Sequence, residues 1–504
     1  MTTASPNRWL LLLTVAAGLL LIALDNSVLY TALPVLTQEL GATASQSLWI
    51  INAYPLVMAG LLLGAGTLGD RLGHRRMFLI GLVLFGIASL MASYSPTPEI
   101  LIGARAFLAV GAAAMMPATL ALIRVTFTVE RERNLAIAIW GSLAVVGSAI
   151  GPIVGGFLLE HFWWGSVFLI NVPVVILAFV FTLFVAPKGK PDPSKTWDMI
   201  SSLQALVALS ALVVAIKEFA NPDRAWHVST GALMVAILAS IIFVRRQARL
   251  PFPLLDFSIF RNAAFSSGVM AAAFAMFALG GIQLVTTQRF QFVAGFTPME
   301  AGLLVSAAAL GSIPTALIGG AFLHRIGLRL LIAGGLALAA LSVLLMIWGL
   351  TDGFGWLITG LMLTGAGVGA AMSVASTAII GNAPVHRAGM AASVEEVSYE
   401  FGSLVAVALL GSLMSAIYSM SVVIPDGVPQ AARDSMAAAA ILAAETGPES
   451  GGAIFEAGAA AFDRGYYAVM YIVAAVLGLA ALITGRLLRG YGPGSAASSY
   501  PAAH

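Results

Sequence analysis

Five charged side chains stand inside stretches that are otherwise apolar enough to cross a membrane. They are Asp25, Arg105, Glu395, Glu396 and Glu400. A carboxylate or guanidinium at the centre of a membrane span costs about 2.5 to 3.5 kcal/mol on insertion scales, so such residues usually line a cavity or a proton path. These positions are therefore the first candidates for a functional site.

Glu396 and Glu400, in the segment VEEVSYEFG, are four residues apart and share one face of a helix. Glu395 points about 100° away from that face. Two neighbouring carboxylates repel each other in a low dielectric if both are ionised, so we expect the pair to hold a proton that a cation can replace. The alternative is that Glu395 and Glu396 lie at an interface and hydrogen-bond to neighbouring backbone.

Asp25 lies about 24 Å along the first apolar stretch, at 1.5 Å per residue, which places it near the midplane of a bilayer. Arg105 lies in the stretch IGARAFLAVGAAAMMPA. It could tune the acidity of a nearby carboxylate during proton transfer, or it could form a structural ion pair with Asp25. The sequence leaves both roles open.

The composition describes a membrane protein. Of 504 residues, 60% are hydrophobic and 10% are charged, and the mean hydropathy is +0.96. A helical span needs about 20 mostly apolar residues, and we expect an all-α protein with fourteen such spans. They begin near residues 9, 46, 77, 98, 134, 165, 199, 228, 263, 298, 330, 354, 391 and 466. The absence of cysteine excludes disulfides and thiol-metal sites.

The positions of lysine and arginine predict the orientation. With the N-terminus inside, about 19 of the 25 Lys and Arg residues fall in inner loops and tails. This bias is typical of multi-pass proteins of the bacterial inner membrane, and it predicts that both termini are cytoplasmic. The formal net charge of +2 gives no reason to expect a nucleic-acid partner.

An internal repeat predicts the architecture. GTLGDRLGHR at 66–75 recurs as GAFLHRIGLR at 320–329, and the same displacement aligns several span positions. We expect two parallel six-helix halves with two inserted helices between them, a 6+2+6 arrangement that suits alternating access. The expected boundaries are 1–186, 187–262 and 263–504, the last including an outer loop at 421–465.

Two motifs resemble those of the major facilitator superfamily, and the chain is identified as a member of it, most similar to its fourteen-helix drug:proton antiporters. GTLGDRLGHRR resembles the cytoplasmic loop motif, whose matching positions are Gly66, Asp70, Arg71, Gly73 and Arg75. GSAIGPIVGG resembles the antiporter signature, whose matching positions are Gly147, Gly151, Pro152, Gly155 and Gly156. The resemblance implies a loop that stabilises one of two states and a fifth span whose glycines allow close helix packing.

The same resemblance implies a function. We expect a proton-coupled antiporter that exports lipophilic, mainly cationic drugs: quaternary ammonium compounds, dyes such as ethidium and acriflavine, and by weaker inference fluoroquinolones. Acids in spans 1 and 13 are the cation and proton sites of the resembling exporters, and the matching positions are Asp25, Glu396 and Glu400. The partners expected are drugs, protons and the bilayer, without a cofactor, and the working unit expected is a monomer.

Aromatic side chains could complete a drug pocket, because a flat cation gains roughly 0.5 to 2 kcal/mol over a ring face. The candidates lie at or near the acidic spans and include one amide: Tyr30, Trp49, Asn52, Tyr54, Trp140, Tyr399 and Phe401. Packing or an interfacial belt is the alternative for each ring. Asn52 stands where relatives that export divalent cations have Asp, which favours monovalent cations.

Three other functions are the alternatives to drug export. A nutrient symporter or uniporter would use the same scaffold without needing the Gly and Pro signature of span 5. A membrane sensor would need an output domain, and no long cytoplasmic segment is expected. A membrane enzyme would need a catalytic constellation, but the sequence has no HExxH, no Ser-His-Asp grouping, no metal-binding pattern and no nucleotide loop. Within the outer loop, AARDSMAAAAILAAETG and AIFEAGAAAFDRGYY predict short amphipathic helices.

Overall fold

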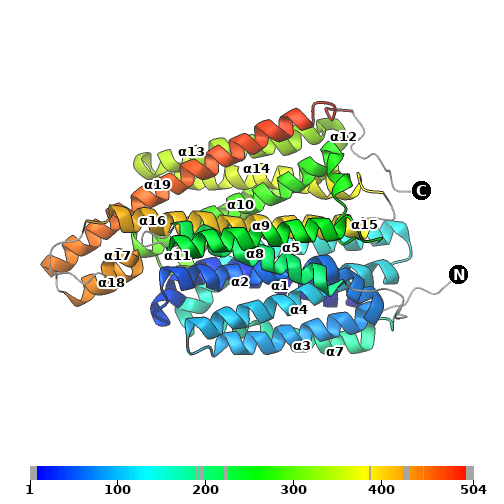
Figure 1. Ribbon diagram of the computed structural model, residues 1–504, viewed down its shortest axis with the longest axis horizontal. Coiled ribbons are helices and arrows are strands. Elements are labelled where there is room, and N and C mark those ends of the chain that lie inside the picture. Colours follow the sequence, from blue (N-terminus) through cyan, green and yellow to red (C-terminus); the bar gives the residue numbers. More distant parts are fainter. Residues whose placement is uncertain are drawn as a thin grey trace.

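The computed structural model describes residues 8–188, 191, 198–220, 225–251, 253–384, 388–423, 431–446 and 448–494. In this part of the chain the regular structure is helical, and the long helices run side by side in one bundle (Figure 1). The start of α1 and the end of α19 lie at one end of the bundle, called here the termini end. The helices α17 and α18 and the start of α19 project from the opposite end.

The elements are given in three groups along the chain. The first group is α1 (Arg8–Glu39), α2 (Ala44–Leu72), α3 (His74–Ser93), α4 (Pro98–Thr126), α5 (Glu130–His161), α6 (Ser166–Leu169) and α7 (Asn171–Val185). The inserted pair is α8 (Met199–Ala220) and α9 (Trp226–Gln247), followed by the 3-10 helix η1 (Phe257–Arg261). The last group is α10 (Ala263–Phe292), α11 (Pro298–Ala321), α12 (Leu323–Ile326), the π-helix η2 (Leu330–Gly334), α13 (Gly335–Asp352), α14 (Phe354–Ile380), α15 (Ala388–Ala406), the π-helix η4 (Val407–Gly411), α16 (Ser412–Ser421), α17 (Ala431–Asp434), α18 (Met436–Glu445) and α19 (Pro448–Leu487).

The described residues contain fewer candidate spans than the fourteen expected. Twelve helices of the described residues are long and apolar enough to cross a membrane, or up to 13 when the bent pair Ala44–Leu62 and Gly64–Leu72 counts as one span. The helix at the expected fifth span, α5, has 32 residues. Several of its side chains lie outside the described residues, and it is not included in that number.

The buried side chains form two large cores that match the two halves of the sequence. One core joins α1 to α7, and it also takes in Leu284 and Val407. The other joins α10 to α19. The loops of the repeat also match in the backbone, since Gly73 (φ +92°) and Gly327 (φ +83°) both have a positive φ that favours glycine.

The inserted helices α8 and α9 pack beside the line where α2 meets α15. Leu56 of α2, Val213 of α8 and Leu404 of α15 belong to one buried cluster there. The inserted pair therefore contacts both halves of the bundle.

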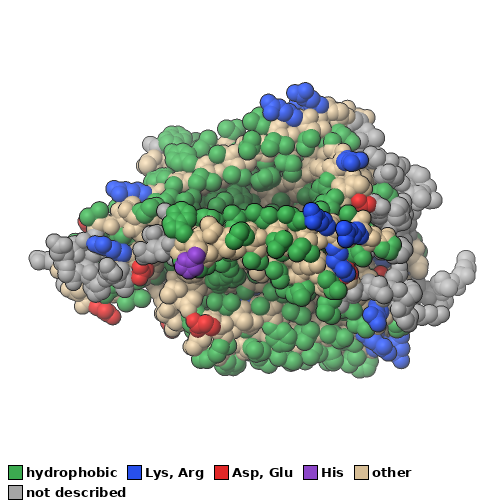
Figure 2. Space-filling model, in the orientation of Figure 1, with side chains coloured by type: hydrophobic (Ala, Val, Ile, Leu, Met, Phe, Trp, Pro, Cys, Tyr) green, Lys and Arg blue, Asp and Glu red, His purple; other side chains and the backbone are tan. Residues whose placement is uncertain are grey.

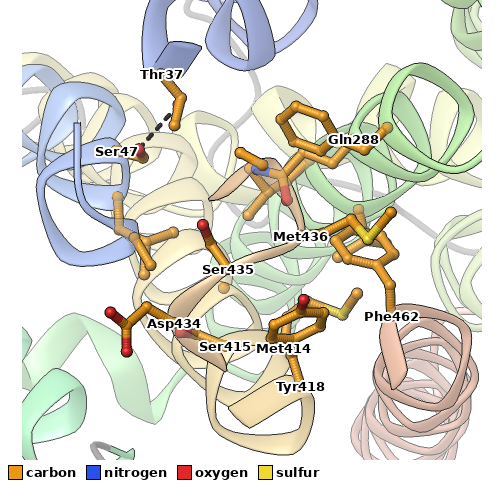
Figure 3. A pocket seen from close by; sticks show the side chains of 17 residues that line it. Thr37, Ser47, Gln288, Met414, Ser415, Tyr418, Asp434, Ser435, Met436 and Phe462 are labelled. Atoms are coloured by element: carbon orange, nitrogen blue, oxygen red, sulfur yellow. Dashed lines mark hydrogen bonds between the residues drawn. The ribbon is translucent and has the colours of Figure 1, made fainter. Parts of the chain in front are cut away.

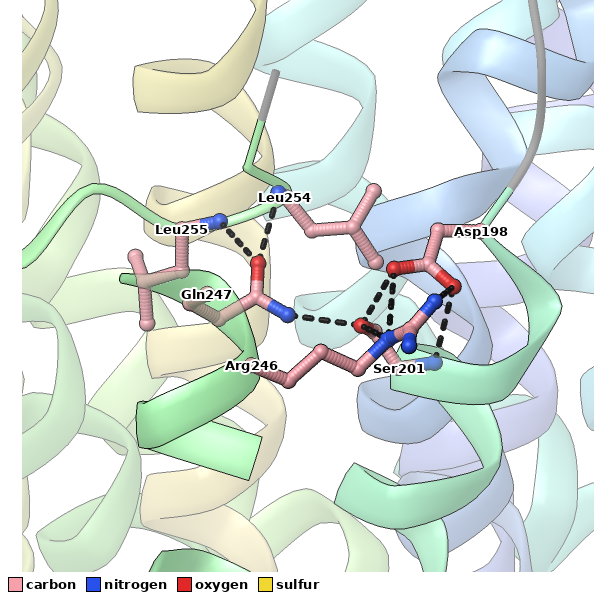
Figure 4. Close-up of polar contacts among 6 residues, drawn as sticks. All are labelled: Asp198, Ser201, Arg246, Gln247, Leu254 and Leu255. Carbon is pink, nitrogen blue, oxygen red and sulfur yellow. Dashed lines mark hydrogen bonds and ion pairs between the residues drawn. The ribbon is translucent and has the colours of Figure 1, made fainter. Parts of the chain in front are cut away.

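Ion pairing and hydrogen bonds connect the start of α8 with the end of α9 (Figure 4). Arg246 binds both carboxylate oxygens of Asp198, at 2.9 and 3.2 Å, and Gln247 donates to Ser201 at 2.7 Å. Burial disfavours the charged form of Asp198, but hydrogen bonds from Arg246 and Ser201 outweigh it and hold the pKa of this carboxyl below its ordinary value. The ion pair therefore stabilises the protein at neutral pH, and that contribution is lost only as the pH falls through the lowered pKa.

The outer loop differs from the expectation in one respect. The first predicted helix appears as α17 and α18, separated at Ser435, whose side chain caps α18 by accepting from the Ala438 amide. The second does not form a separate helix: it is continuous with the last span in the 40-residue α19. Alanine-rich sequence without proline after Pro448 gives the helix no reason to stop before the membrane. Residues 424–430 and 447 lie outside the described residues.

Candidate functional site

Asp25 and Arg105 form an ion pair inside the first half. Arg105 Nη1 donates to Asp25 Oδ2, and both side chains are almost completely buried. Asn171 of α7 donates to the other carboxylate oxygen at 3.0 Å and approaches Ser89 Oγ at 3.3 Å. The carboxylate of Asp25 on α1 is thus bound by Arg105 of α4 and Asn171 of α7, and Ser89 of α3 contacts Asn171. Such pairing and hydrogen bonding keep a buried charge stable.

Tyr54 of α2 lies next to this pair, and Asn52 precedes it by two residues on the same helix. The guanidinium of Arg105 stands 4.8 Å from the centre of the Tyr54 ring, and Arg105 Nε donates to the Ile50 carbonyl. Neither the amide of Asn52 nor the hydroxyl of Tyr54 has a hydrogen-bond partner within the described part of the chain, although both side chains are completely buried. Buried polar groups without partners are costly, so their presence here suggests a site prepared for a polar ligand.

The three glutamates of the second half lie on α15 with different surroundings. Glu395 is buried and accepts from Tyr399 Oη, one turn further along the same helix, at 3.0 Å. Glu396 interacts electrostatically with both other acids, whereas Glu400 interacts with Arg105 across the boundary between the halves. Arg105 therefore forms an ion pair with Asp25 of α1 and interacts electrostatically with Glu400 of α15.

The predicted aromatic residues divide between this region and the packing around it. Tyr30 of α1 is buried and its hydroxyl lies 3.0 Å from Ser403 Oγ of α15. Trp49 packs beside α8, with the Lys217 ammonium 4.6 Å from its ring centre, and Trp140 donates to Thr119 at 3.1 Å. Phe401 is 37% exposed. The structure thus brings Tyr30, Tyr54 and Tyr399 to the acids, and it places Trp49 and Trp140 in contacts within the protein. Asn52 is buried on the same helix as Tyr54, and it makes no hydrogen bond to the acids among the described residues.

The glycines of the span 5 motif let α5 approach two helices. A side chain at Gly147, Gly151 or Gly155 would collide with α1, most severely at Gly151, where a Cβ would stand 1.7 Å from Ser27 Oγ. On another side, a Cβ at Gly156 would stand 2.5 Å from the Cα of Met299 in α11. The Pro152 carbonyl similarly faces Gly302 of α11. The motif therefore lies at a contact between the halves.

The loop motif between α2 and α3 lies at the termini end. Asp70 pairs with His74 Nε2 at 3.3 Å, and Arg75 Nη2 donates to the Leu183 carbonyl of α7 at 2.6 Å. Arg71 is exposed, and Gly66 comes near Pro117 of α4. These contacts stay within the first half, so the described conformation does not show this loop joining the two halves.

A proline creates a contact between the halves that the sequence analysis missed. Pro34 lies inside α1 and has no N–H, so it leaves the carbonyl of Tyr30 without its helical donor. Thr287 of α10 donates to that carbonyl at 3.1 Å, and Gln291, one turn further on, donates to the Thr31 carbonyl at 2.9 Å. Two side chains of the second half thus satisfy backbone of the first half, on the side away from the termini end.

We expect loss of these two bonds to open that side. Each bond contributes about 0.5 to 1.5 kcal/mol, so the double variant Thr287→Val/Gln291→Leu should favour the open state by about tenfold. The chain has no cysteine, so a single Thr31→Cys reporter, at a position that is completely buried, can be labelled with a maleimide without background. The labelling rate should rise about tenfold. Thr286→Val, which loses a bond to Tyr466 within the second half, should leave the rate unchanged; equal rates in both variants would refute the assignment.

A cavity of about 70 Å³ lies at the same side, where α1, α2, α10 and α16 meet residues 434–437 (Figure 3). Gln288, Tyr418 and Met436 are among the residues that line it. The acids of α15 do not line this cavity, and its volume is below the roughly 300 to 1,000 Å³ of drug-sized pockets. It is therefore not the predicted cation site.

Two models of transporter families match the chain. The model of the Major Facilitator Superfamily matches residues 15–291, and that of the Sugar (and other) transporter family matches residues 261–418. The chain belongs to the Major Facilitator Superfamily. This facilitator is accordingly a multi-pass membrane transporter.

The curated relatives of this facilitator are bacterial resistance and efflux proteins. The methyl viologen resistance protein SmvA of Salmonella typhimurium is 37% identical over 461 residues, covering 90% of this chain and 93% of the relative. The multidrug efflux pump LfrA of Mycolicibacterium smegmatis is 37% identical over 95% of this chain and 96% of its own. The multidrug resistance protein Stp of Mycobacterium tuberculosis is 31% identical over 81% of this chain.

Solved structures support the facilitator fold. A bacterial homologue of the human lysosomal transporter Spinster, in an inward-facing and unoccupied conformation, has a TM-score of 0.67 at 17% identity and covers 97% of this chain. The peptide transporter POT in complex with sulfate has a TM-score of 0.62 at 17% identity. At these identities the likeness concerns the fold alone.

Proposed function

We propose that this facilitator is a proton-coupled exporter of lipophilic cations. The observation that supports it most is the placement of Arg105, which pairs with Asp25 of one half and interacts with Glu400 of the other. A buried cation that pairs with an acid of one half and interacts electrostatically with an acid of the other provides a place where the protonation of one half affects the other. The name of one relative supports a cationic substrate, since SmvA is named for resistance to methyl viologen, an organic dication; it does not support the preference for monovalent cations expected from Asn52.

The proposed exchange proceeds at the acids of α15. A cation that enters from the cytoplasm binds Glu396 and Glu400 when they release a proton, with Tyr30, Tyr54 and Tyr399 offering ring faces and Asn52 an amide. Protons from outside then neutralise the carboxylates and displace the cation. The proton gradient drives export. When two protons enter for each monovalent cation that leaves, one net positive charge moves inward, which is worth about 2.3 kcal/mol per 100 mV.

We infer the same topology that the sequence predicts: fourteen spans in halves 1–186 and 263–504, separated by the inserted segment 187–262, with both termini in the cytoplasm. The working unit proposed is a monomer, and the activity is transport without enzymatic chemistry. The glycines of α5 and the loop at 66–75 are proposed to stabilise alternate states of the two halves. This assignment makes the termini end the cytoplasmic side.

Ethidium efflux from energised cells tests the proposal. Cells that express the protein should lose preloaded ethidium several-fold faster than cells with an empty vector, and a protonophore should remove the difference, because the proton gradient is the driving force. Efflux that persists at full rate with the protonophore would contradict proton coupling. Efflux equal to the empty vector, at verified membrane expression, would contradict cation export.

A further inference from the structure

A basic pocket lies at the termini end, between the start of α3 and the end of α7, away from the acids of the proposed transport site. Its volume is about 360 Å³. The residues that line it are Leu72, Gly73, Arg75, Arg76, Leu79 and Lys188. Figure 2 shows Lys and Arg side chains gathered at this end of the molecule. Three cations and, among the described residues, no acid line the pocket, so its charge favours an anion.

The backbone at the start of α3 adds to this preference. Gly73 precedes the helix, and no side chain caps its first turn. The N–H groups of a first helical turn have no intrahelical partners, and together with the helix dipole they attract anions such as phosphate. The nearest acid of the loop, Asp70, is paired with His74 and does not line the pocket.

Arg75 is positioned between α3 and α7 by a bond to the protein itself. Its Nη2 donates to the Leu183 carbonyl at 2.6 Å, whereas its Nε is buried and has no hydrogen-bond partner among the described residues. The side chains of Arg76 and Lys188 are exposed, and no such anchor is found for them among the described residues. The side chain of Arg75 is thus held in place on one side of the pocket, and the exposed side chains of Arg76 and Lys188 also line it.

An apolar surface continues from the pocket towards the middle of the bundle. Ile80, Val83 and Ile87 are exposed on one face of α3, and Val180 and Phe184 are exposed on one face of α7, with Phe184 at 80%. The helices α3 and α7 pack side by side (Figure 1). A free phosphate ion would gain nothing from these side chains, but the acyl chains of a phospholipid would cover them.

We propose that this pocket binds the phosphate headgroup of an anionic glycerophospholipid whose acyl chains lie along α3 and α7. The three cations that line the described part of the pocket disfavour a zwitterionic lipid, because its ammonium group would be repelled by them. The site is independent of the proposed transport chemistry, and a binding measurement tests it whether or not the protein exports drugs.

Native mass spectrometry of the detergent-purified full-length protein provides that measurement. Equal amounts of phosphatidylglycerol and phosphatidylcholine with identical acyl chains are added, and the first lipid adduct is compared. We expect at least about fivefold preference for phosphatidylglycerol, lost in the variant Arg76→Gln/Lys188→Gln, since each cation near an anionic lipid is worth about 1 kcal/mol. The control Arg245→Gln/Arg249→Gln removes the same charge from exposed positions near the same end and should keep the preference.

Three results would overturn the proposal. The first is an equal preference for phosphatidylglycerol in the Arg76→Gln/Lys188→Gln variant and in the unmodified protein. The second is equal binding of phosphatidylcholine. The third is loss of the lipid adduct on adding millimolar inorganic phosphate, with a phosphate adduct in its place, which would assign the pocket to a free anion. Thermal unfolding of each variant shows whether it remains folded.

Discussion

Glu400→Gln should abolish ethidium export, lowering the initial rate at least tenfold at equal membrane expression. The substitution keeps the shape and the hydrogen-bonding capacity of the side chain, and it removes the charge that interacts with Arg105 and would hold the drug cation. Because Glu400 is not completely buried, the neutral amide should leave the fold intact. The rate is measured as protonophore-sensitive ethidium efflux from preloaded cells.

A matched control for this prediction is Glu300→Gln, at the start of α11. Glu300 completes the capping box with Thr297, and Gln serves the same capping function, so this variant removes a carboxylate without removing a structural bond. Its efflux should stay within about twofold of the unmodified protein. If Glu400→Gln also keeps full efflux, the carboxylate of α15 does not exchange drug for proton.

Arg105→Met should destabilise the protein by about 3 to 5 kcal/mol, because it leaves the buried carboxylate of Asp25 without its charged partner. Asn171 would still donate to that carboxylate, but one neutral amide cannot replace a guanidinium. The double variant Asp25→Asn/Arg105→Met removes both charges and should recover most of the lost stability. The measurement is thermal unfolding of the purified variants in one detergent.

The double variant also separates the two roles that the sequence left open for this pair. If Asp25 and Arg105 serve coupling as well as structure, the double variant will be stable but will not export ethidium. Stability restored together with full export would make the pair structural only. A double variant as unstable as Arg105→Met alone would show that the loss comes from packing around residue 105 and not from an uncompensated charge.

Sequence patterns predicted the features that depend on short spacings. The hydropathy of the chain gave the helical membrane fold, and the repeat at 66–75 and 320–329 gave a matching pair of glycine turns. Composition also identified the acids as exceptional, since a charged residue in an apolar stretch is visible without a structure. The described residues give 12 or up to 13 candidate spans and not fourteen, because α2 is bent and several side chains of α5 lie outside the described residues.

Tertiary contacts were beyond the reach of the sequence. Nothing in the segment LINVP indicates that Asn171 reaches Asp25, since the two are 146 residues apart. The proline at 34 could have signalled an unsatisfied carbonyl at Tyr30, but the donor, Thr287, comes from the other half. Trp49 was predicted to face the drug, and only the packing of the inserted α8 reveals Lys217 over its ring.

Proton release on drug binding tests the exchange mechanism most directly. Purified protein in a weakly buffered detergent solution near neutral pH is mixed with ethidium, and the change in pH is followed with an indicator dye. The account predicts that the protein releases protons when the cation binds, and that Glu396→Gln/Glu400→Gln releases none. Ethidium that binds with unchanged affinity and without proton release would contradict a carboxylate site shared by drug and proton.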